Sequence, residues 1–314
     1  MTTVLITHPA FLRHDTGPYH PERPDRMRAI DKALADETFA SIERRDAPLR
    51  DDDETFIALA HGVRYVTDMS ATLAQISSGH ESVDADTVAS PGTWEAARRA
   101  VGAGLDAVDL VMSDQAANAF CQVRPPGHHA ENNRAMGFCF FNNIAIAAHY
   151  ARAKHGAERV AVVDFDVHHG NGTQEIFWSD KDLFYGSTHQ MPLFPGTGAL
   201  QETGVGNIFN APLRSGDGRE AFEEALRSRI LGPLENFSPD LLLISAGFDA
   251  HHRDPLAGLE LTEQDFQWAT EALADVARRH ANGRIVSMLE GGYDLKGLAL
   301  STAAHVKALL EAGA

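Results

Sequence analysis

The stretch VVDFDVHHGNG, residues 162–172, places charged side chains inside a run of apolar ones. Its valines and phenylalanine suit a buried strand, but Asp164 and Asp166 stand among them and two histidines follow at once. A carboxylate that is buried without a partner costs roughly several kcal/mol, because its charge loses the surrounding water. The stretch therefore predicts a buried strand that ends at a site where both carboxylates find a partner.

Short β-rich runs alternate with amphipathic helical patterns along most of the chain. Several of these runs are continuously apolar rather than alternating, as expected for strands that are buried on both faces. The alternation predicts an α/β fold, with a parallel sheet and helices on both of its faces. The predicted strands are residues 4–8, 118–123, 160–167, 183–188, 241–247 and 285–292.

Three helices have ends that can be recognised from capping and stop residues. The region 189–218, rich in glycine and proline, is too irregular for a core element and is predicted to be a long functional loop. The predicted helices are residues 91–111 with Ser90 as cap and Pro91 at the first helical position, 142–155 ended by Gly156, and a long helix capped by Thr262 that ends near His280.

Composition places the chain among ordinary globular proteins, with 44% apolar and 23% charged residues in a length of 314. The chain has no Ser/Pro/Gly linker, internal repeat or low-complexity tract, so residues 1–314 are interpreted as one domain. The formal net charge of −17 argues against a nucleic-acid partner and suits a cationic substrate such as a lysine-rich peptide or a polyamine.

Cysteine usage and the absence of apolar segments bear on the compartment. Cys121 and Cys139 form no CxxC pair, which excludes a disulfide framework or a cysteine zinc site and favours a reducing cytoplasm. The N-terminal residues lack the pattern of a signal peptide, and no run of 18 apolar residues occurs. We therefore expect a cytoplasmic protein with no membrane partner.

The carboxyl ends of two predicted strands carry side chains that suit a metal ion. Residues two apart on a strand point to the same side, so we expect Asp164, Asp166 and His168 to share one face. A second predicted strand, in LLLISAGFDAHHRDP, ends in the same way at Asp249. Asp166, His168 and Asp249 would give Zn²⁺ three ligands and leave room for a water and a substrate. The alternative is that Asp164 caps a turn and the histidines line a polar crevice.

Two further motifs carry groups that suit catalysis. RPPGHHAENNRAMGFCFFNN, residues 124–143, has His128 and His129 side by side in a turn, where different hydrogen-bond partners can give each ring its own role. LEGGYD, residues 289–294, has two glycines that let the backbone approach a ligand, and the Tyr293 hydroxyl could donate to a developing oxyanion. Taken alone, each motif also fits exposed loop histidines or a core tyrosine.

Together, and in this order, RPPGHHA, GFCFFNN, DFDVHHGNGTQ, SAGFDAH and EGGY resemble the zinc-dependent histone deacetylases and their bacterial amidohydrolase relatives. HPERPDRM near the start also looks like theirs, so the resemblance runs from about residue 8 to 300. The asparagine in HHGNG and the sequence SAGFD resemble the class II branch of the family. The resemblance implies the arginase/deacetylase fold, a single parallel eight-stranded sheet flanked by helices on both faces.

The resemblance also implies catalytic roles. Zn²⁺ would be bound by Asp166, His168 and Asp249. His129 would act as general base and acid, His128 would be hydrogen-bonded to Asp164, and Tyr293 would stabilise the oxyanion. Asn171 stands where class I members have an aspartate behind the catalytic histidine. We therefore expect His129 to lack a charged partner and to have a pKa that is raised less than it would be beside an aspartate.

Substrate and alkali-metal sites are implied in the same way. Phe138 and Phe194 match the two aromatic residues that sandwich the acyl-lysine stem, and Leu256 matches a residue at the tunnel mouth. Arg26 matches an arginine beneath the site. The remaining implied substrate contacts are Gly137, Gly291 and Gly292, and K⁺ is implied at Asp164, Asp166, His168, Ser187 and Thr188, with a second monovalent site near Phe177.

The resulting hypothesis is a zinc amidohydrolase that removes acetyl or short acyl groups from an acylated lysine peptide or a small acylated amine. Whether it forms a homo-oligomer is left open. The nearest alternative is an acetylpolyamine amidohydrolase, but polyamine-selective members of the family place a glutamate where this chain has Leu256. We therefore expect acetyl-lysine to be preferred over acetylpolyamines.

Two other readings fit less well. An arginase-like dimetal ureohydrolase needs bridging carboxylates. The corresponding positions read His168-His169 and Asp249-Ala250-His251, so two carboxylates are missing. A catalytically silent acyl-amine binding protein would be expected to lack a metal ligand, a tandem histidine or the tyrosine, and all of these are present.

Overall fold

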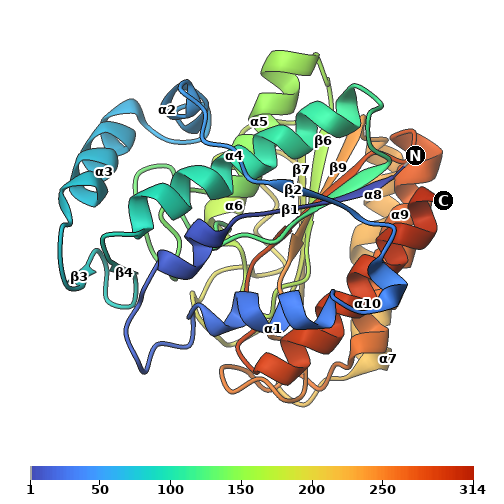
Figure 1. Ribbon diagram of the computed structural model, residues 1–314. Helices are drawn as coiled ribbons and strands as arrows, with labels where there is room; N and C mark the ends of the chain where they lie inside the picture. Colours follow the sequence, from blue (N-terminus) through green and yellow to red (C-terminus); the bar gives the residue numbers. More distant parts are fainter. Residues whose placement is uncertain (1) are drawn as a thin grey trace.

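The structure is a computed structural model that describes residues 2–314 (Figure 1). Within those residues, one eight-stranded sheet has the order β2-β1-β5-β10-β9-β6-β7-β8, and all of its pairings are parallel. This confirms the predicted fold class. The strands are β1 (Thr3–Thr7), β2 (Glu43–Asp46), β5 (Asn118–Cys121), β6 (Val160–Asp164), β7 (Leu183–Gln190), β8 (Ile208–Leu213), β9 (Leu241–Ala246) and β10 (Ile285–Leu289), and β3 (Glu81–Ser82) pairs with β4 (Val88–Ala89) in a separate short hairpin.

Helices cover both faces of the sheet (Figure 1). On one face α4 (Thr93–Met112) packs along α5 (Asn143–His155), and on the other α10 (Leu295–Gly313) packs between α1 (Asp25–Ala33) and α9 (Glu263–His280). The shorter helices are α2 (Asp53–Ile57), α3 (Val63–Gln75), α6 (Asn171–Phe177), α7 (Arg219–Ala225) and α8 (Gly232–Phe237), with 3₁₀ turns at Pro9–Arg13 and Glu37–Phe39 and a π-helical turn at Leu226–Leu231.

The central strands are buried from end to end, which explains their continuous apolar runs. The two edge strands escaped prediction. β2 has the sequence ERRD and is mostly exposed, and β8 has the sequence IFNAPL. An edge strand pairs on one side only, so it tolerates charged residues and proline. The prediction of a loop over 189–218 is wrong in part, because β7 continues to Gln190 and β8 lies inside the segment, while the rest of it is irregular.

Two of the three predicted helix starts are confirmed. The Asn142 side chain accepts a hydrogen bond from the backbone N–H of Ala145 at the start of α5, and Thr262 forms a capping box with Asp265 at the start of α9. The start predicted at Ser90-Pro91 is wrong by two residues. α4 begins at Thr93, because the Ser90 hydroxyl accepts instead from the backbone N–H of Asp15.

The topology places four loops at one edge of the sheet. β5, β10, β9 and β6 are neighbours at its centre, and their carboxyl ends lead into the motifs that contain the tandem histidines, Tyr293, Asp249 and Asp166. Parallel α/β sheets bind ligands at this edge. Both cysteines are free and buried. None of the helices within residues 2–314 combines the length and apolarity needed to cross a membrane.

Candidate metal centre and active site

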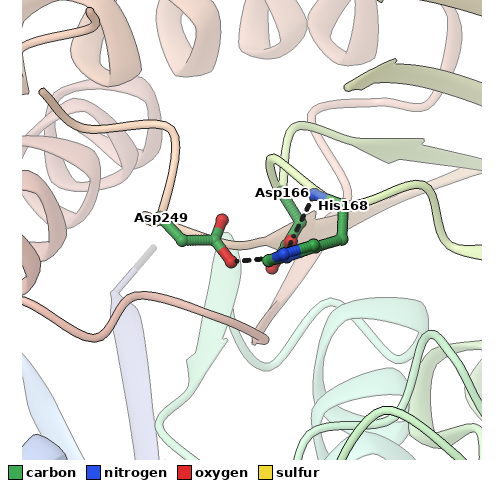
Figure 2. Close-up of side chains that lie close together, drawn as sticks. All are labelled: Asp166, His168 and Asp249. Carbon is green, nitrogen blue, oxygen red and sulfur yellow. Dashed lines mark hydrogen bonds and ion pairs between the residues drawn. The ribbon is translucent and has the colours of Figure 1, made fainter. Parts of the chain in front are cut away.

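Asp166, His168 and Asp249 converge at the carboxyl edge of the sheet (Figure 2). Their candidate ligand atoms all lie within 4.8 Å of one another. His168 Nδ1 is 3.2 Å from Asp166 Oδ1 and 3.0 Å from Asp249 Oδ2. All three side chains are buried. The structure therefore brings together the three residues that the sequence pointed to as a metal site.

Asp164, Asp166 and His168 were expected to share one face of a strand, but the structure positions them differently. β6 ends at Asp164, so Asp166 and His168 lie on the bend that follows the strand. The backbone N–H of Asp166 donates to Asp164 Oδ1 (3.0 Å), and the N–H of His168 donates to Asp166 Oδ1 (2.9 Å). Side-chain carboxylates that accept from the backbone two residues on form tight turns. Turn hydrogen bonds, rather than strand alternation, therefore aim these side chains.

Two glycines make room for the carboxylates. A Cβ at Gly247 would lie 2.0 Å from Asp166 Oδ2, and a Cβ at Gly291 would lie 2.2 Å from Asp249 Oδ2. The backbone N–H of Gly291 also donates to Asp166 Oδ2 (2.8 Å). Gly291 therefore supports the candidate ligands directly, which differs from the substrate contact predicted for it. Gly247 was missed, although it stands in the SAGFD motif.

The electrostatics of this cluster suit a divalent cation. Burial, together with repulsion from Asp166, raises the pKa of Asp249 to about 7. Two buried carboxylates this close cannot both be ionised cheaply unless positive charge lies between them. Two carboxylates and one imidazole form a donor set that Zn²⁺ accepts in catalytic sites with an open position. The residues present therefore fit the ion that the sequence resemblance implies.

His128 lies among carboxylates. Its Nδ1 is 3.0 Å from Asp164 Oδ2, as predicted, and its backbone N–H donates to Glu290 Oε2 (3.1 Å). Burial alone would lower the pKa of His128, but the charges of Asp164, Asp166 and Glu290 outweigh burial and raise it to about 10. The surrounding carboxylates therefore favour the protonated form of His128.

Asp164 and Glu290, the two carboxylates that contact His128, have further hydrogen-bond partners of their own. The Tyr185 hydroxyl donates to Asp164 Oδ2 (3.1 Å) and accepts from the backbone N–H of Gly170 (3.0 Å). Glu290 Oε2 also accepts from the N–H of Gly127 (2.7 Å), and burial raises the pKa of Glu290 to about 7. Tyr185 and Glu290 were not singled out from the sequence. Glu290 stands within a predicted buried strand, so the argument applied to Asp164 would have found it.

His129 has a neutral partner. Its Nδ1 is 2.8 Å from Asn171 Oδ1, and Asn171 Nδ2 donates to Glu131 Oε1 (2.7 Å). Burial, with the positive charges of His128 and His168, holds the pKa of His129 well below its usual range. The direct partner of His129 is thus uncharged, as expected, and a carboxylate that was not expected, Glu131, lies behind the asparagine.

A cavity of about 230 Å³ adjoins the candidate metal site at His168. Phe138 and Phe194 form its apolar walls, and His129 and His168 lie at its base. Phe194 packs edge-on against His129, with 5.1 Å between ring centroids. The complete lining is Asp86, His129, Gly137, Phe138, His168, Leu193, Phe194, Leu256 and Tyr293. Four predicted substrate residues are thus brought together: Gly137, Phe138, Phe194 and Leu256.

Asp86 is an acidic residue of this cavity that sequence reasoning missed. Its Oδ1 accepts from the backbone N–H of Gly137 (3.2 Å), and its carbonyl oxygen is 3.0 Å from His20 Nε2. The adjacent Thr87 hydroxyl accepts from the N–H of Phe138 (3.1 Å). Phe138 has a left-handed backbone, with φ of 69°, so these contacts hold an aromatic wall in a conformation that side chains rarely adopt.

Tyr293 reaches the cavity from the loop after β10. Its backbone N–H donates to Asp254 Oδ2 (2.7 Å), and its ring lies 5.9 Å from that of Phe138. Arg26 is beneath it, with the guanidinium carbon 5.1 Å from the ring centroid and Nε donating to the carbonyl of Gly292 (2.7 Å). Burial raises the pKa of the Tyr293 phenol, so its hydroxyl keeps its proton. Arg26 and Gly292 therefore support Tyr293 from below.

The oxygen-rich positions implied for K⁺ lie beside the same loops. Ser187 pairs with Asp164 between β7 and β6, and the Thr188 hydroxyl is buried with no hydrogen-bond partner among residues 2–314. Near Phe177, where a second monovalent ion was implied, the Asn207 side chain contacts the backbone carbonyls. Asn207 Nδ2 donates to the backbone oxygens of Phe177 (2.9 Å), Asp180 (3.0 Å) and Leu183 (2.7 Å).

Comparison with known proteins agrees with this geometry. A family model described as "Histone deacetylase domain" matches residues 20–309. The histone deacetylase-like amidohydrolase of Pseudomonas aeruginosa is 40% identical over 281 residues, which cover 87% of this chain and 72% of that protein. A probable deacetylase of Archaeoglobus fulgidus is 36% identical over 303 residues, which cover 95% of this chain and 83% of that protein.

A solved structure supports the same assignment. The crystal structure of the HDA15 HD domain superposes with a TM-score of 0.92 and 35% sequence identity, covering 99% of this chain and 88% of that one. A match of this extent shows the same fold over nearly the whole chain. From the ordered motifs, the converging site and these matches, the chain belongs to the histone deacetylase family of deacetylases and amidohydrolases.

Proposed function

We propose that the protein is a zinc-dependent amidohydrolase that removes acetyl or other short acyl groups from the side-chain amine of lysine. The observation that carries this proposal is that the candidate metal site, one of the tandem histidines and the tyrosine all contribute to one cavity. His129, Tyr293 and His168, which belongs to the cluster with Asp166 and Asp249, all line one cavity with aromatic walls. An acyl-lysine presents a long apolar stem that ends in a polar amide, which matches that arrangement.

Zn²⁺ would be held by Asp166, His168 and Asp249, and it would supply Lewis acidity toward a carbonyl oxygen and lower the pKa of water. The chain's own residues position the reactants. Phe138 and Phe194 would hold the methylene stem between their rings, limiting its rotation and excluding bulk water. The Tyr293 hydroxyl would donate a hydrogen bond to the carbonyl oxygen as negative charge develops there.

Proton transfer falls to His129. Because its Nδ1 faces Asn171 Oδ1, which can only accept, Nδ1 carries the hydrogen and Nε2 is the basic nitrogen. The lowered pKa keeps this ring neutral and ready to take the proton of the attacking water. His129 would then return a proton to the leaving amine. The products are a free amine and a short carboxylate.

The test combines metal analysis with a panel of substrates. The zinc-loaded protein should contain one Zn²⁺ per chain and hydrolyse an acetyl-lysine peptide. Asp249→Ala should lose both properties, because two remaining ligands are too few for a stable site. Asp275→Ala, at an exposed aspartate of α9, is the matched control and should keep both. Near-stoichiometric zinc in Asp249→Ala would refute the ligand assignment.

An acetylpolyamine amidohydrolase is the second candidate, and Asp86 is the observation that favours it. Leu256 offers no charge to a distal ammonium, but the Asp86 carboxylate lies in the same cavity lining. A cation near that carboxylate would lose water and gain a partner, whereas a cation against leucine would only lose water. The choice of substrate therefore depends on which of the two side chains the distal end of the substrate reaches.

Selectivity is measured as the ratio of kcat/KM for an acetyl-lysine peptide to that for N-acetylputrescine or N8-acetylspermidine. We expect the parent protein to favour acetyl-lysine, and Leu256→Glu to narrow or invert the ratio. Asp86→Asn should raise the ratio if Asp86 holds a distal ammonium and lower it if Asp86 holds the peptide backbone. A parent preference for the acetylpolyamine would show that our interpretation of Leu256 is wrong.

We also propose K⁺ as a structural ion near Asp164, Ser187 and Thr188. The buried Thr188 hydroxyl without a partner supports a ligand there, and oxygen donors suit a hard cation. A second monovalent ion near Phe177 would compete with the Asn207 amide nitrogen, whose two hydrogens are shared among the three carbonyls that converge there.

A further inference from the structure

The loop after the tandem histidines places a carboxylate behind Asn171. Glu131 Oε1 accepts a hydrogen bond from Asn171 Nδ2 (2.7 Å), and Asn171 Oδ1 faces His129 Nδ1 (2.8 Å). We propose that Glu131 is a positioning residue that fixes, through the Asn171 amide, which nitrogen of His129 carries the hydrogen. This inference rests on the role of His129 in the proposed function.

The argument follows from what each atom can donate or accept. An ionised carboxylate only accepts hydrogen bonds, so the end of the Asn171 amide that faces Glu131 must be its NH₂ group. The opposite end, which faces His129 Nδ1, must then be the carbonyl oxygen. That oxygen only accepts, so Nδ1 must carry the hydrogen and Nε2 is left as the base. The acceptor oxygen of Glu131 thus sets the tautomer of His129 without touching its ring.

An asparagine needs such a partner, whereas an aspartate does not. The two ends of an amide are nearly equal in shape, so an unrestrained Asn171 could turn its NH₂ group toward His129. The ring would then carry its hydrogen on Nε2, and its basic nitrogen would be Nδ1, which faces Asn171 and would be occupied by that NH₂ group. The other acceptors near Asn171 Nδ2 are weak, since the His129 carbonyl is 3.4 Å away and the Met136 thioether sulfur is 3.3 Å away.

The backbone of Glu131 is held on both sides, which makes its side chain a defined partner. Its N–H donates to the carbonyl of Arg134 (2.9 Å), and its carbonyl is 2.9 Å from His61 Nδ1. His61 Nε2 accepts from the N–H of Asn142 (2.8 Å), so the hydrogen of His61 lies on Nδ1 and is donated to Glu131. Glu131 therefore lies at the end of a chain of hydrogen bonds that runs from the Asn142 N–H through His61 to the Glu131 carbonyl.

The kinetic test compares three substitutions in the zinc-loaded protein. Glu131→Ala should lower kcat for an acetyl-lysine peptide by about 10-fold or more, the scale of one lost charge-assisted hydrogen bond, with little change in KM. Glu131→Gln keeps an acceptor oxygen and should stay within about 3-fold of the parent. Glu175→Ala is the matched control, because that carboxylate holds the neighbouring Asn132 N–H (2.7 Å) without touching Asn171, and its rate should not change.

A second comparison separates this role from a merely structural one. In an Asn171→Asp background the carboxylate behind His129 would face Glu131 directly, and two like charges would repel. Glu131→Ala should therefore raise kcat in that background, while it lowers kcat in the parent. If Glu131→Ala lowers kcat equally in both backgrounds, Glu131 only supports the loop and the proposal is overturned.

A measurement without substrate keeps the proposal testable even if no amide is hydrolysed. The hydrogen-bonded Nδ1–H of His129 should give a low-field proton NMR signal, assigned by its absence in His129→Ala. That signal should persist in Glu131→Gln and disappear or broaden in Glu131→Ala. Its persistence in Glu131→Ala would refute the positioning role. Absence of hydrolysis in the parent would instead refute the proposed function and leave this NMR result to stand alone.

Discussion

His128 and His129 are adjacent in sequence and have opposite surroundings. His128 contacts the carboxylate of Asp164 and lies above Glu290, so it is stabilised as a cation. His129 faces the Asn171 amide and is held neutral by burial. A ring that stays charged can stabilise developing negative charge, and a ring that stays neutral can accept a proton. Different partners thus suit two identical side chains to different tasks.

Tyr293→Phe is the residue-scale prediction. The variant should fold, keep its zinc and lose roughly 10²–10³-fold in turnover, the usual scale for one oxyanion donor. The phenol keeps its proton because burial raises its pKa, so it acts as a donor throughout the neutral range. Steady-state kinetics with an acetyl-lysine peptide measure the loss, and Tyr19→Phe, at a tyrosine that is 97% exposed, is the control. An unchanged rate in Tyr293→Phe would exclude the role.

At the scale of elements, the site is made by loops that follow the four central strands. These strands fix the spacing of their carboxyl ends, and short turns then aim the side chains. The turns need close approach between backbones and carboxylates, as the contacts of Gly247 and Gly291 show. A side chain at either position would compete for the space of a candidate metal ligand.

Gly247→Ala tests this steric requirement. A Cβ at Gly247 would lie 2.0 Å from Asp166 Oδ2 and 2.4 Å from Asp166 Cβ, so the candidate ligand must move. Zinc affinity, measured by chelator competition, should fall by about 10-fold or more, since misplacing one ligand weakens the whole site. Gly232→Ala, where a Cβ meets nothing within 4 Å, should bind zinc like the parent. Equal affinity in both variants would show that the loop after β9 adapts freely.

The central elements could be predicted because burial leaves a clear pattern. β6 and β9 have continuous apolar runs, and each is followed by a carboxylate that needs a partner. The edge strands β2 and β8 lacked that pattern because pairing on one side leaves their polar residues in water. Capping residues located two helix starts, but at Ser90 a tertiary contact with Asp15 displaced the expected cap.

Two residues whose contacts with the site join segments far apart in sequence could not be predicted in the same way. Asp86 follows the small β3 strand and reaches Gly137 only in the folded chain. Glu131 stands in a polar turn, and its link to Asn171 depends on how two loops pack. Neither residue has a local pattern that distinguishes it from a solvated surface charge. Tertiary packing brings both residues to the site, and no local sequence pattern records that packing.

At the scale of the whole molecule, a cluster of buried charged side chains links the N-terminal segment to the candidate site. Glu22 contacts Arg124 Nε (2.5 Å) and Arg26 Nη1 (3.0 Å), and all three side chains are fully buried. Arg26 also donates to the carbonyl of Gly292, next to Tyr293. Burial alone would raise the pKa of Glu22, but the positive charge of Arg124 and hydrogen bonds hold it well below its usual range.

Glu22→Gln should therefore destabilise the protein in a manner that depends on pH. At pH 7 it leaves Arg124 buried without a counter-charge, which costs about 3–5 kcal/mol in free energy of unfolding. The folded carboxyl binds its proton more weakly than the unfolded one, so its contribution is complete above the ordinary pKa of 4.5 and is lost as pH falls below it. Urea unfolding should thus show a large deficit at pH 7 that shrinks at pH 4. Glu43→Gln removes the exposed pair with Arg45 and should cost less than about 1 kcal/mol at either pH. A deficit for Glu22→Gln that does not change with pH would mean that packing, rather than charge, makes Glu22 necessary.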